Sequence, residues 1–248
     1  MKPSHLVNAA CGLLLAALCN LAPAQVLQPL AVAASDKPGQ PWRVVGLPKA
    51  GKAPTRFDIV PLDGLRVLRI TADNAYANLI HELPALAVSP GTLLRWRWRL
   101  DQGLPLADLQ RKSGDDVPLK VCALFDMPLA RLGLAERSLL RLARSVSTEF
   151  LPSATLCYVW DQKLPEGTEL PNAYTRRVRY IVVNSGTVQL KQWVSHERNL
   201  AADFLKAFGH ESDGLVPPLV AILIGADSDT TDGSSLAYAS DLALTPGP

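Results

Sequence analysis

The chain has 248 residues, of which 48% are hydrophobic and 19% are charged, and its formal net charge is +2. This composition excludes a disordered chain, which would hold fewer apolar residues and a larger net charge. The near-neutral charge gives no reason to expect nucleic acid as a partner. Beyond residue 24, no charge-free apolar run reaches the length of a membrane span, so no transmembrane segment is expected there.

The first 24 residues have the plan of a secretory signal peptide. A weakly basic start precedes an apolar stretch over 6–21, and Ala22-Pro23-Ala24 offers small residues at the cleavage positions. Cleavage near Ala24 predicts a periplasmic or secreted protein. Residues 25–41, rich in Ala, Pro and Gln, are expected to be a leader segment, and residues 42–248 a single domain.

From residue 43 onward, apolar residues recur at every second position between turns that are rich in Pro and Gly. This period is that of half-buried β-strands. The expected strands are Arg43–Leu47, Arg56–Val60, Arg66–Thr71, Ala77–Glu82, Leu93–Leu100, Leu119–Phe125, Ala154–Trp160, Val178–Val183, Lys191–Val194, Leu219–Ile224 and Ala237–Leu244. Many short strands with such turns predict an all-β fold, a jelly-roll-like β-sandwich.

Two segments have helical spacing and are expected to be short helices that cover the sandwich. Asn199–Phe208 begins with a residue suited to an N-cap and is followed by Gly209. Glu136–Val146 gathers its leucines on one side and three arginines on the other. We expect its apolar side to cover a sheet end, with the arginines in water. The alternative is a basic amphipathic helix that lies on an anionic surface.

Cys122 and Cys157 are the cysteines that remain after cleavage, and each lies in an expected strand. In an exported chain, two such residues can form a disulfide. Two buried free thiols are the alternative, because cysteine is among the most buried residue types. No pair of histidines has metal-ligand spacing, so a zinc site is not expected here.

The expected strand Leu93–Leu100 alternates between apolar and basic residues. Its core face is predicted to hold Leu94, Trp96, Trp98 and Leu100, and its other face Arg95, Arg97 and Arg99. Three like charges on one strand repel one another unless acids face them. The candidate partners are Asp115, Asp116, Asp126 and Asp161. The alternative is an anionic ligand held by bidentate guanidinium contacts, with Arg177 and Arg179 of another strand widening the patch.

The same four aspartates, Asp115, Asp116, Asp126 and Asp161, are the candidates for catalysis. Adjacent carboxylates such as Asp115 and Asp116 raise each other's pKa or need a cation. Asp126 and Asp161 each follow a cysteine by four residues and sit at a strand end. Paired carboxylates are suited to general acid–base chemistry on a polymer. Their spacing does not decide between this role and pairing with arginines.

An acidic turn over residues 227–233 lies between the last two expected strands. Carboxylates at short spacing suit Ca²⁺, and the candidate ligands are Asp227, Asp229 and Asp232. A turn held by Asx hydrogen bonds explains the same residues. Asp241, on the last strand, is expected to be free to approach Asp115 and Asp116.

Several strings of the sequence, read in order, resemble one bacterial family. They lie at Leu94–Arg99, Lys112–Asp116, Ala154–Asp161, Asn172–Thr175, Asp203–Phe204, Ala207–Gly209 and Ile224–Thr231. The family is known as domain of unknown function three thousand and forty-seven, and the resemblance covers nearly all of the chain after the leader segment. It implies no particular activity. The last expected strand is also similar to the closing strand of jelly-roll carbohydrate-binding modules, which is an architectural likeness alone.

The sequence therefore predicts an exported module that binds a polysaccharide or an anionic envelope polymer. Its candidate ligand-binding residues are Arg95, Arg97, Arg99, Arg177, Arg179, Tyr158, Tyr174 and Trp193. A hydrolase or lyase acting through paired aspartates is one alternative, and a structural or interaction protein of the envelope is another. Binding would need exposed aromatic residues along a groove, catalysis two carboxylates roughly 5–10 Å apart in a cleft, and a structural role a large apolar patch.

Overall fold

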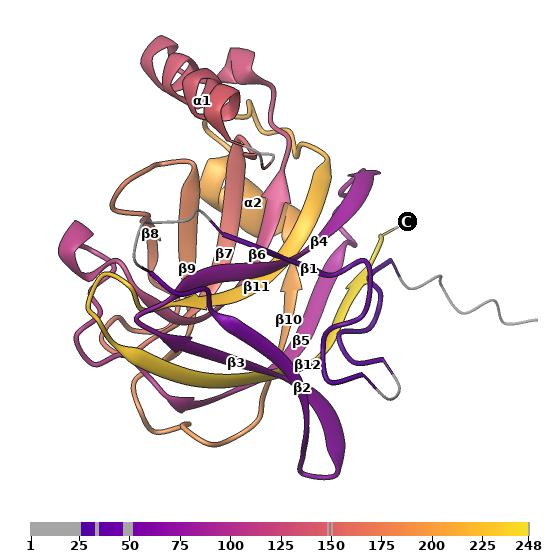
Figure 1. Ribbon diagram of the computed structural model, residues 1–248. Helices are drawn as coiled ribbons and strands as arrows, with labels where there is room; N and C mark the ends of the chain where they lie inside the picture. The colour runs from indigo at the N-terminus through magenta and orange to yellow at the C-terminus, as the bar shows by residue number, and fades with distance from the viewer. Residues whose placement is uncertain (1–25, 33–34, 47–51, 148, 150, 248) are drawn as a thin grey trace, which may run out of the picture.

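The computed structural model describes residues 26–32, 35–46, 52–147, 149 and 151–247 (Figure 1). The expected signal peptide lies outside these residues. Within them the chain is all-β, a jelly-roll-like sandwich of two sheets with two α-helices. None of the described helices is long and apolar enough to span a membrane.

In the described part of the chain, the larger sheet has seven strands in the order β1-β4-β11-β6-β7-β9-β8. They are β1 (Arg43–Val45), β4 (Tyr76–Leu86), β11 (Leu219–Asp227), β6 (Val117–Phe125), β7 (Ala154–Asp161), β9 (Val178–Ser185) and β8 (Glu169–Pro171). Neighbouring strands are antiparallel except β7 and β9, which are parallel. Because parallel partners need a crossover connection, the chain passes between them through the edge strand β8.

The smaller sheet has five antiparallel strands in the order β10-β5-β12-β3-β2, again within the described residues. They are β10 (Val194–Asn199), β5 (Leu93–Gln102), β12 (Ser234–Thr245), β3 (Leu65–Asp73) and β2 (Arg56–Leu62). Figure 1 shows β2, β3 and β12 curving together across the lower part of the molecule.

The main core lies between the two sheets. The predicted core face of β5 is confirmed, because Leu94, Trp96, Trp98 and Leu100 are each at most 1% exposed. From the larger sheet, Tyr158 packs on Trp96 with ring centres 5.2 Å apart. Tyr158 is fully buried, so the expectation of an exposed ligand-binding ring is wrong at this position. The reason is that β7 lies inside the larger sheet with both faces covered, where alternation does not indicate exposure.

The segment just before β1 is part of the fold. Leu27 and Leu30 are buried in the main core together with Trp42. The Trp42 indole Nε1 donates a hydrogen bond to the Gln28 carbonyl (2.8 Å), and the Gln28 N–H donates to His81 Nε2 (3.2 Å). The packed structure therefore begins within the residues that the sequence marks as a leader.

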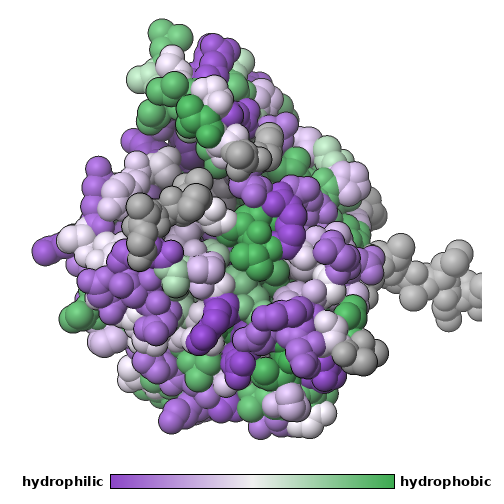
Figure 2. All heavy atoms as spheres, viewed as in Figure 1, coloured by the Kyte–Doolittle hydropathy of each residue, from purple (hydrophilic) through white to green (hydrophobic). Residues whose placement is uncertain are grey.

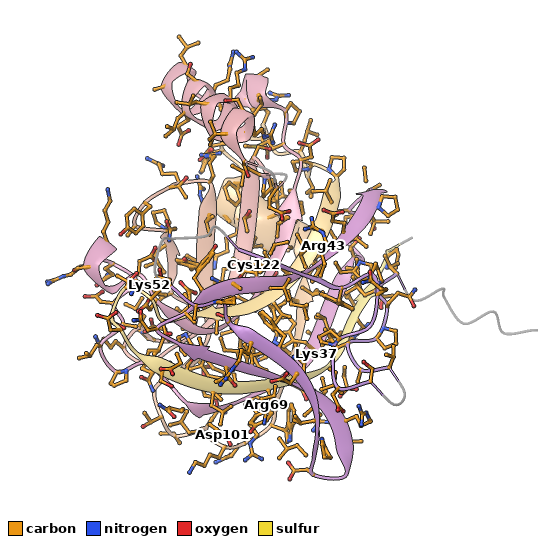
Figure 3. All side chains as sticks on the ribbon, viewed as in Figure 1. Lys37, Arg43, Lys52, Arg69, Asp101 and Cys122 are labelled. Atoms are coloured by element: carbon orange, nitrogen blue, oxygen red, sulfur yellow. A yellow bond between two sulfur atoms is a disulfide. The ribbon has the colours of Figure 1, made fainter. Side chains whose placement is uncertain are left out.

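The outer face of the larger sheet carries a second apolar cluster, which includes Ile80, Leu124, Val159 and Val182. At its centre, Cys122 of β6 lies opposite Cys157 of β7, and a disulfide joins them. Figure 3 labels Cys122 on this face. Both cysteines are buried. Of the two alternatives for these residues, the structure contains the disulfide.

Helix α2 (Leu200–Phe208) begins as the sequence predicts, because the Asn199 side chain accepts a hydrogen bond from the Ala202 N–H at 3.0 Å. Its aromatic residues Phe204 and Phe208 are buried in the main core. The helix thus fills one end of the space between the sheets.

Helix α1 (Leu134–Val146) departs from the prediction. It projects from one end of the sandwich (Figure 1), and Leu140 is its one buried residue. Arg137 and Arg144 turn inward and donate hydrogen bonds to backbone carbonyls of the adjoining loops. Leu139 and Leu142, which were expected to cover a sheet end with Leu140, instead face solvent, so the expectation is wrong for these two residues. Carbonyl acceptors near the helix hold the arginine side against the protein.

Candidate functional site

The outer face of the smaller sheet brings together four of the predicted ligand-binding residues. Alternation along β5 places Arg95, Arg97 and Arg99 there, opposite the buried tryptophans. Trp193 precedes the edge strand β10, and Tyr238 of β12 lies directly across from Arg99. We call the surface formed by these five residues the arginine face. Arg69 of β3, whose register partner is Tyr238, and Asp101 of β5 mark this side of the molecule in Figure 3.

Arginines and aromatic rings are stacked on the arginine face. The guanidinium carbon of Arg97 lies 5.3 Å from the centre of the Trp193 ring, and that of Arg99 lies 5.9 Å from the Tyr238 ring. Both separations allow cation–π attraction. The Trp193 Nε1 donates a hydrogen bond to Asp63 (3.0 Å), which fixes the orientation of the indole.

Each arginine of β5 is also paired with a carboxylate. The pairs are Arg95–Glu197 (2.5 Å), Arg97–Asp241 (3.4 Å), Arg99–Asp101 (2.6 Å) and Arg99–Asp63 (3.2 Å). None of the four acids predicted as partners is among them. Those four lie at or next to the ends of strands of the larger sheet. Glu197 and Asp241 come close to the arginines because β10 and β12 pair with β5. The sequence offered one local signal, since Asp101 follows Arg99 on the same strand.

Among these arginines, Arg97 has the longest ion-pair contact. Its side chain is 37% exposed and that of Asp241 is 62% exposed. Exposed pairs of this kind contribute about 0–1 kcal/mol, so separating Arg97 from this carboxylate costs little. Arg99 is more enclosed, and its hydrogen bond to Asp101 raises its pKa further above the usual value, although burial opposes this. Arg97 is therefore the arginine best placed to contact a ligand.

Arg177 and Arg179 do not widen this patch, contrary to expectation, because they belong to the other sheet. Both pair with Glu211, and Arg179 lies over the Phe208 ring with its guanidinium carbon 4.2 Å from the ring centre. Burial lowers the pKa of Arg179. Its side chain lines a small cavity of about 220 Å³ together with Lys206.

A second cluster of polar side chains lies at one end of the larger sheet. Three buried carboxylates, those of Asp116, Asp227 and Asp229, have oxygens within 4.8 Å of one another. We call these residues and Lys120 the acidic cluster. The Lys120 ammonium contacts Asp227 at 2.7 Å, and both side chains are buried. Asp232, the third predicted Ca²⁺ ligand, lies outside the cluster and pairs with Lys52 at 2.9 Å.

Asp116 takes the place that the sequence assigned to Asp232, and it also ties the acidic turn to β6. It accepts hydrogen bonds from the backbone N–H groups of Thr230 (3.0 Å) and Thr231 (2.7 Å) and from the Thr231 hydroxyl (2.6 Å). These contacts hold the turn between β11 and β12 against the start of β6. Asp116 and the turn, which are far apart in sequence, are thus joined by three hydrogen bonds.

Burial dominates the electrostatics of the acidic cluster. It raises the pKa of Asp227 to about 6, assisted by the negative charges of Asp116 and Asp115 and opposed by Lys120. Burial alone would lower the pKa of Lys120, but the charge and hydrogen bond of Asp227, together with Tyr76 and Tyr180, outweigh it, so the pKa of the ammonium is raised. The lysine therefore stays charged and neutralises Asp227, one of the three carboxylates.

The remaining catalytic candidates are dispersed. Asp115 accepts two hydrogen bonds from the Asn172 amide, and Asp161 caps a turn by accepting from the N–H groups of residues 163 and 164. Asp126 follows the end of β6 that is remote from Asp116, about 30 Å away at the rise of an extended strand. Asp241 pairs with Arg97 and does not approach Asp115 or Asp116. Asp115, Asp126, Asp161 and Asp241 thus do not form a pair of neighbouring, solvent-accessible carboxylates.

Tyr174 is exposed, as predicted for a binding aromatic, but it lies apart from the arginine face. Its hydroxyl donates a hydrogen bond to the Lys112 carbonyl (3.0 Å), and the Lys112 ammonium lies 5.3 Å from the ring centre. The neighbouring Asn172 accepts from the Tyr174 N–H and links this loop to Asp115. Of the three predicted aromatic residues, Trp193 alone stands with the arginines of β5.

Comparison with known proteins places the chain in a family. The model described as "Protein of unknown function (DUF3047)" matches residues 40–243. The chain belongs to this family. No curated protein sequence matches it.

Two solved structures are similar at low levels. One is the N-terminal CBM22-1-CBM22-2 tandem domain of Paenibacillus barcinonensis Xyn10C, with a TM-score of 0.35, 11% identity, and coverage of 83% of this chain and 46% of that one. The other is the agarase AgWH50C, with a TM-score of 0.32, 8% identity, and coverage of 89% and 24%. This DUF3047 chain thus spans less than half the length of either protein.

Proposed function

We propose that this DUF3047 protein is a glycan-binding module and that the arginine face is its binding surface. The observation that carries the proposal is the stacking of Arg97 on the partly exposed Trp193 ring. An indole offers a flat apolar surface to the C–H side of a sugar ring. Because Arg97 is held at Asp241 by one long, exposed contact, it is free to turn toward the hydroxyl groups of a sugar seated on the indole.

The charges on the arginine face favour a neutral glycan over a polyanion. The three arginines of β5 contact four carboxylates, those of Glu197, Asp241, Asp101 and Asp63. A surface without net positive charge does not attract a polyanion at long range. Sugar hydroxyls both donate and accept hydrogen bonds. They therefore suit a surface on which guanidinium donors alternate with carboxylate acceptors.

The sequence supports a location in which such a ligand is available. The pattern at Ala22-Pro23-Ala24 is that of a cleaved signal peptide, and export would expose the mature protein to envelope or environmental polysaccharides. Sequencing the N-terminus of protein recovered from the periplasm or the medium tests this part of the proposal. We expect the mature chain to start at Gln25, and an uncleaved cytosolic product would overturn export.

Affinity electrophoresis tests the binding surface. The processed chain is run in native gels that contain soluble β-glucan, xylan, galactan or a polyuronate. We expect retardation in at least one neutral gel, loss of that retardation in Trp193→Ala, and full retention in the control Tyr174→Ala, whose exposed ring lies elsewhere. Retardation in the polyuronate gel alone, in none of the gels, or to the same extent in Trp193→Ala would overturn the proposal.

A further inference from the structure

A row of side chains crosses the arginine face at right angles to the strands. Arg99 of β5 lies opposite Tyr238 of β12, and Tyr238 lies opposite Arg69 of β3. On the other side of β5, the register of β10 places Trp193, the residue just before that strand, level with Arg99. Aromatic and basic residues therefore alternate across the smaller sheet, in the order Trp193, Arg99, Tyr238 and Arg69.

The two aromatic rings of this row are held through one arginine. Asp63 accepts a hydrogen bond from the Trp193 Nε1 at 3.0 Å and pairs with Arg99 at 3.2 Å. The guanidinium carbon of Arg99 lies 5.9 Å from the centre of the Tyr238 ring. Trp193 and Tyr238 are both partly exposed. A ligand on the arginine face thus meets two rings in a fixed relation to each other.

The spacing of the rings follows from the sheet. Strands β10 and β12 are the neighbours of β5 on its two sides. Neighbouring strands lie about 4.8 Å apart, so the backbone positions of Trp193 and Tyr238 are roughly 10 Å apart. In an extended glycan, one sugar unit advances along the chain by about one such strand spacing. A glycan that runs across the strands therefore places one unit on each ring and one unit between them, over Arg99.

Tyr238 has a hydrogen-bond donor on its far side. Arg69 pairs with Asp58 at 3.1 Å, and the arginine side chain is 41% exposed. Arg97 stands beside the Trp193 ring in a similar way. Each ring thus has a neighbouring arginine that can donate to sugar hydroxyls. Figure 2 shows hydrophilic and hydrophobic side chains side by side along the bottom of the molecule, where β2, β3 and β12 lie in Figure 1.

We propose that Trp193 and Tyr238 form two subsites for an extended, β-1,4-linked glycan that runs across the strands of the smaller sheet. This inference rests on the proposed glycan-binding function and names its ligand class. In a β-1,4-linked chain each unit is turned over relative to the one before, so every second unit presents the same face. Rings that stand two units apart therefore meet the same sugar face. An α-1,4-linked chain coils and does not offer one flat side to both rings.

Titration calorimetry with short oligosaccharides tests the two subsites. The probes are β-1,4-linked glucose, mannose or xylose of two, three and four units, and α-1,4-linked maltotriose. In at least one β-1,4-linked series, we expect the trisaccharide to bind about tenfold more tightly than the disaccharide, which cannot reach both rings. A factor of ten is about 1.4 kcal/mol, a magnitude that one aromatic contact can supply. Maltotriose should bind no better than the disaccharide.

Variants of the second ring make the test specific. Tyr238→Ala should lower the affinity for the trisaccharide about tenfold, to that of the disaccharide, and should leave disaccharide binding at Trp193 unchanged. Tyr238→Phe keeps the ring and should retain the difference between the two lengths. The control Tyr174→Ala removes an aromatic ring outside the arginine face and should bind as the wild type does. The length dependence of the wild type tests the inference without any variant.

The outcomes separate this inference from the function on which it rests. Absence of binding to every neutral polysaccharide, or full binding by Trp193→Ala, would remove the binding surface itself. With that surface intact, equal affinities for two and three units, or a length difference that survives in Tyr238→Ala, would overturn the two subsites alone. Maltotriose that binds as tightly as the β-1,4-linked trisaccharides, or retardation by a neutral polysaccharide without binding of any β-1,4-linked probe, would overturn the ligand class.

Discussion

Lys120 of β6 and Asp227 of β11 form a buried ion pair with a 2.7 Å contact between neighbouring strands. Two further buried carboxylates, Asp116 and Asp229, lie beside it. Removing one partner of a buried pair leaves an uncompensated charge and costs about 3–5 kcal/mol. We expect Lys120→Met to lower the free energy of unfolding in urea by that amount. Asp227→Asn should also be destabilising, because it leaves the buried ammonium without its carboxylate. A loss below about 1 kcal/mol in Lys120→Met would contradict this account.

The position of Lys120 also bears on the Ca²⁺ hypothesis. Its ammonium already neutralises Asp227, one of the three carboxylates that would hold the ion, so we expect the wild-type melting temperature to be the same in millimolar Ca²⁺ and in chelator. In Lys120→Met, where Asp227 has lost its cation, the three carboxylates should bind the ion, which should raise the melting temperature by several degrees. A wild-type rise that chelation reverses and Asp116→Ala abolishes would restore Ca²⁺ as a ligand of the native protein.

Protonation of His196 should destabilise the fold. Its ring packs between Trp96 and Trp98, with both ring-centre distances 5.0 Å, and Nε2 lies 2.7 Å from Asn184 Oδ1. Burial, together with the charge of Arg198, lowers the pKa of His196 to about 4. The unfolded chain binds this proton near pH 6.5. The stability that the neutral ring contributes is therefore present above about pH 6.5 and is lost as the pH falls toward 4.

Asp227, whose pKa is raised, changes stability in the opposite direction over part of the same pH range. Comparison with a variant therefore isolates the contribution of His196. Melting temperatures of the wild type and of His196→Gln are measured between pH 7 and pH 4. We expect the wild-type curve to fall more steeply with acidification. Parallel curves would show that the histidine does not titrate in this window.

The disulfide Cys122–Cys157 closes a sequence separation of 35 residues. In the chain-entropy model a loop of this length stabilises the fold by about 3–4 kcal/mol. We expect the double variant Cys122→Ala/Cys157→Ala to lose a similar amount in urea denaturation. Because both sulfurs are buried, a mild reductant should leave the native bond intact and cleave it once denaturant is added. Non-reducing peptide mapping that finds free thiols in native protein would contradict the bond.

Most of the fold follows from local pattern, and the exceptions have identifiable causes. The predicted strand Lys191–Val194 is wrong in its extent, since β10 runs over Val194–Asn199. Strand β10 is polar and charged, and its own residues do not alternate between apolar and polar. It forms a strand because it pairs with β5. The three-residue β8 was not predicted, because it too has no alternation of apolar and polar residues. Long alternating runs such as β5 were predictable because one face of each is buried.

The candidate site was less predictable, because strand register assembles it. Trp193 and Arg97 are far apart in sequence, and it is the β5–β10 pairing that stacks them. Likewise Asp241 reaches Arg97 only because β12 pairs with β5 and shifts register beside Ser240. Charge and alternation identified the arginines, but not the acids that face them.

The arginine face provides a contrast between two neighbouring residues. Arg97 makes one exposed 3.4 Å contact with Asp241, whereas Arg99 is held by Asp101 at 2.6 Å and by Asp63 at 3.2 Å and is more enclosed. We expect Arg97→Leu to leave the melting temperature nearly unchanged, because an exposed pair contributes about 0–1 kcal/mol. Arg99→Leu should lower it, since Asp101 then loses its guanidinium donor, whereas Asp63 keeps the Trp193 indole as a donor.

Glycan binding should show the reverse order. In affinity electrophoresis with the polysaccharide that retards the wild type, Arg97→Leu should lose most of the retardation while remaining folded, because Arg97 supplies the donor beside the Trp193 ring. Arg99→Leu, assayed at a temperature where it is folded, should retain more of the binding. Loss of stability without loss of binding in Arg97→Leu would make this arginine a structural partner of Asp241 and remove it from the binding surface.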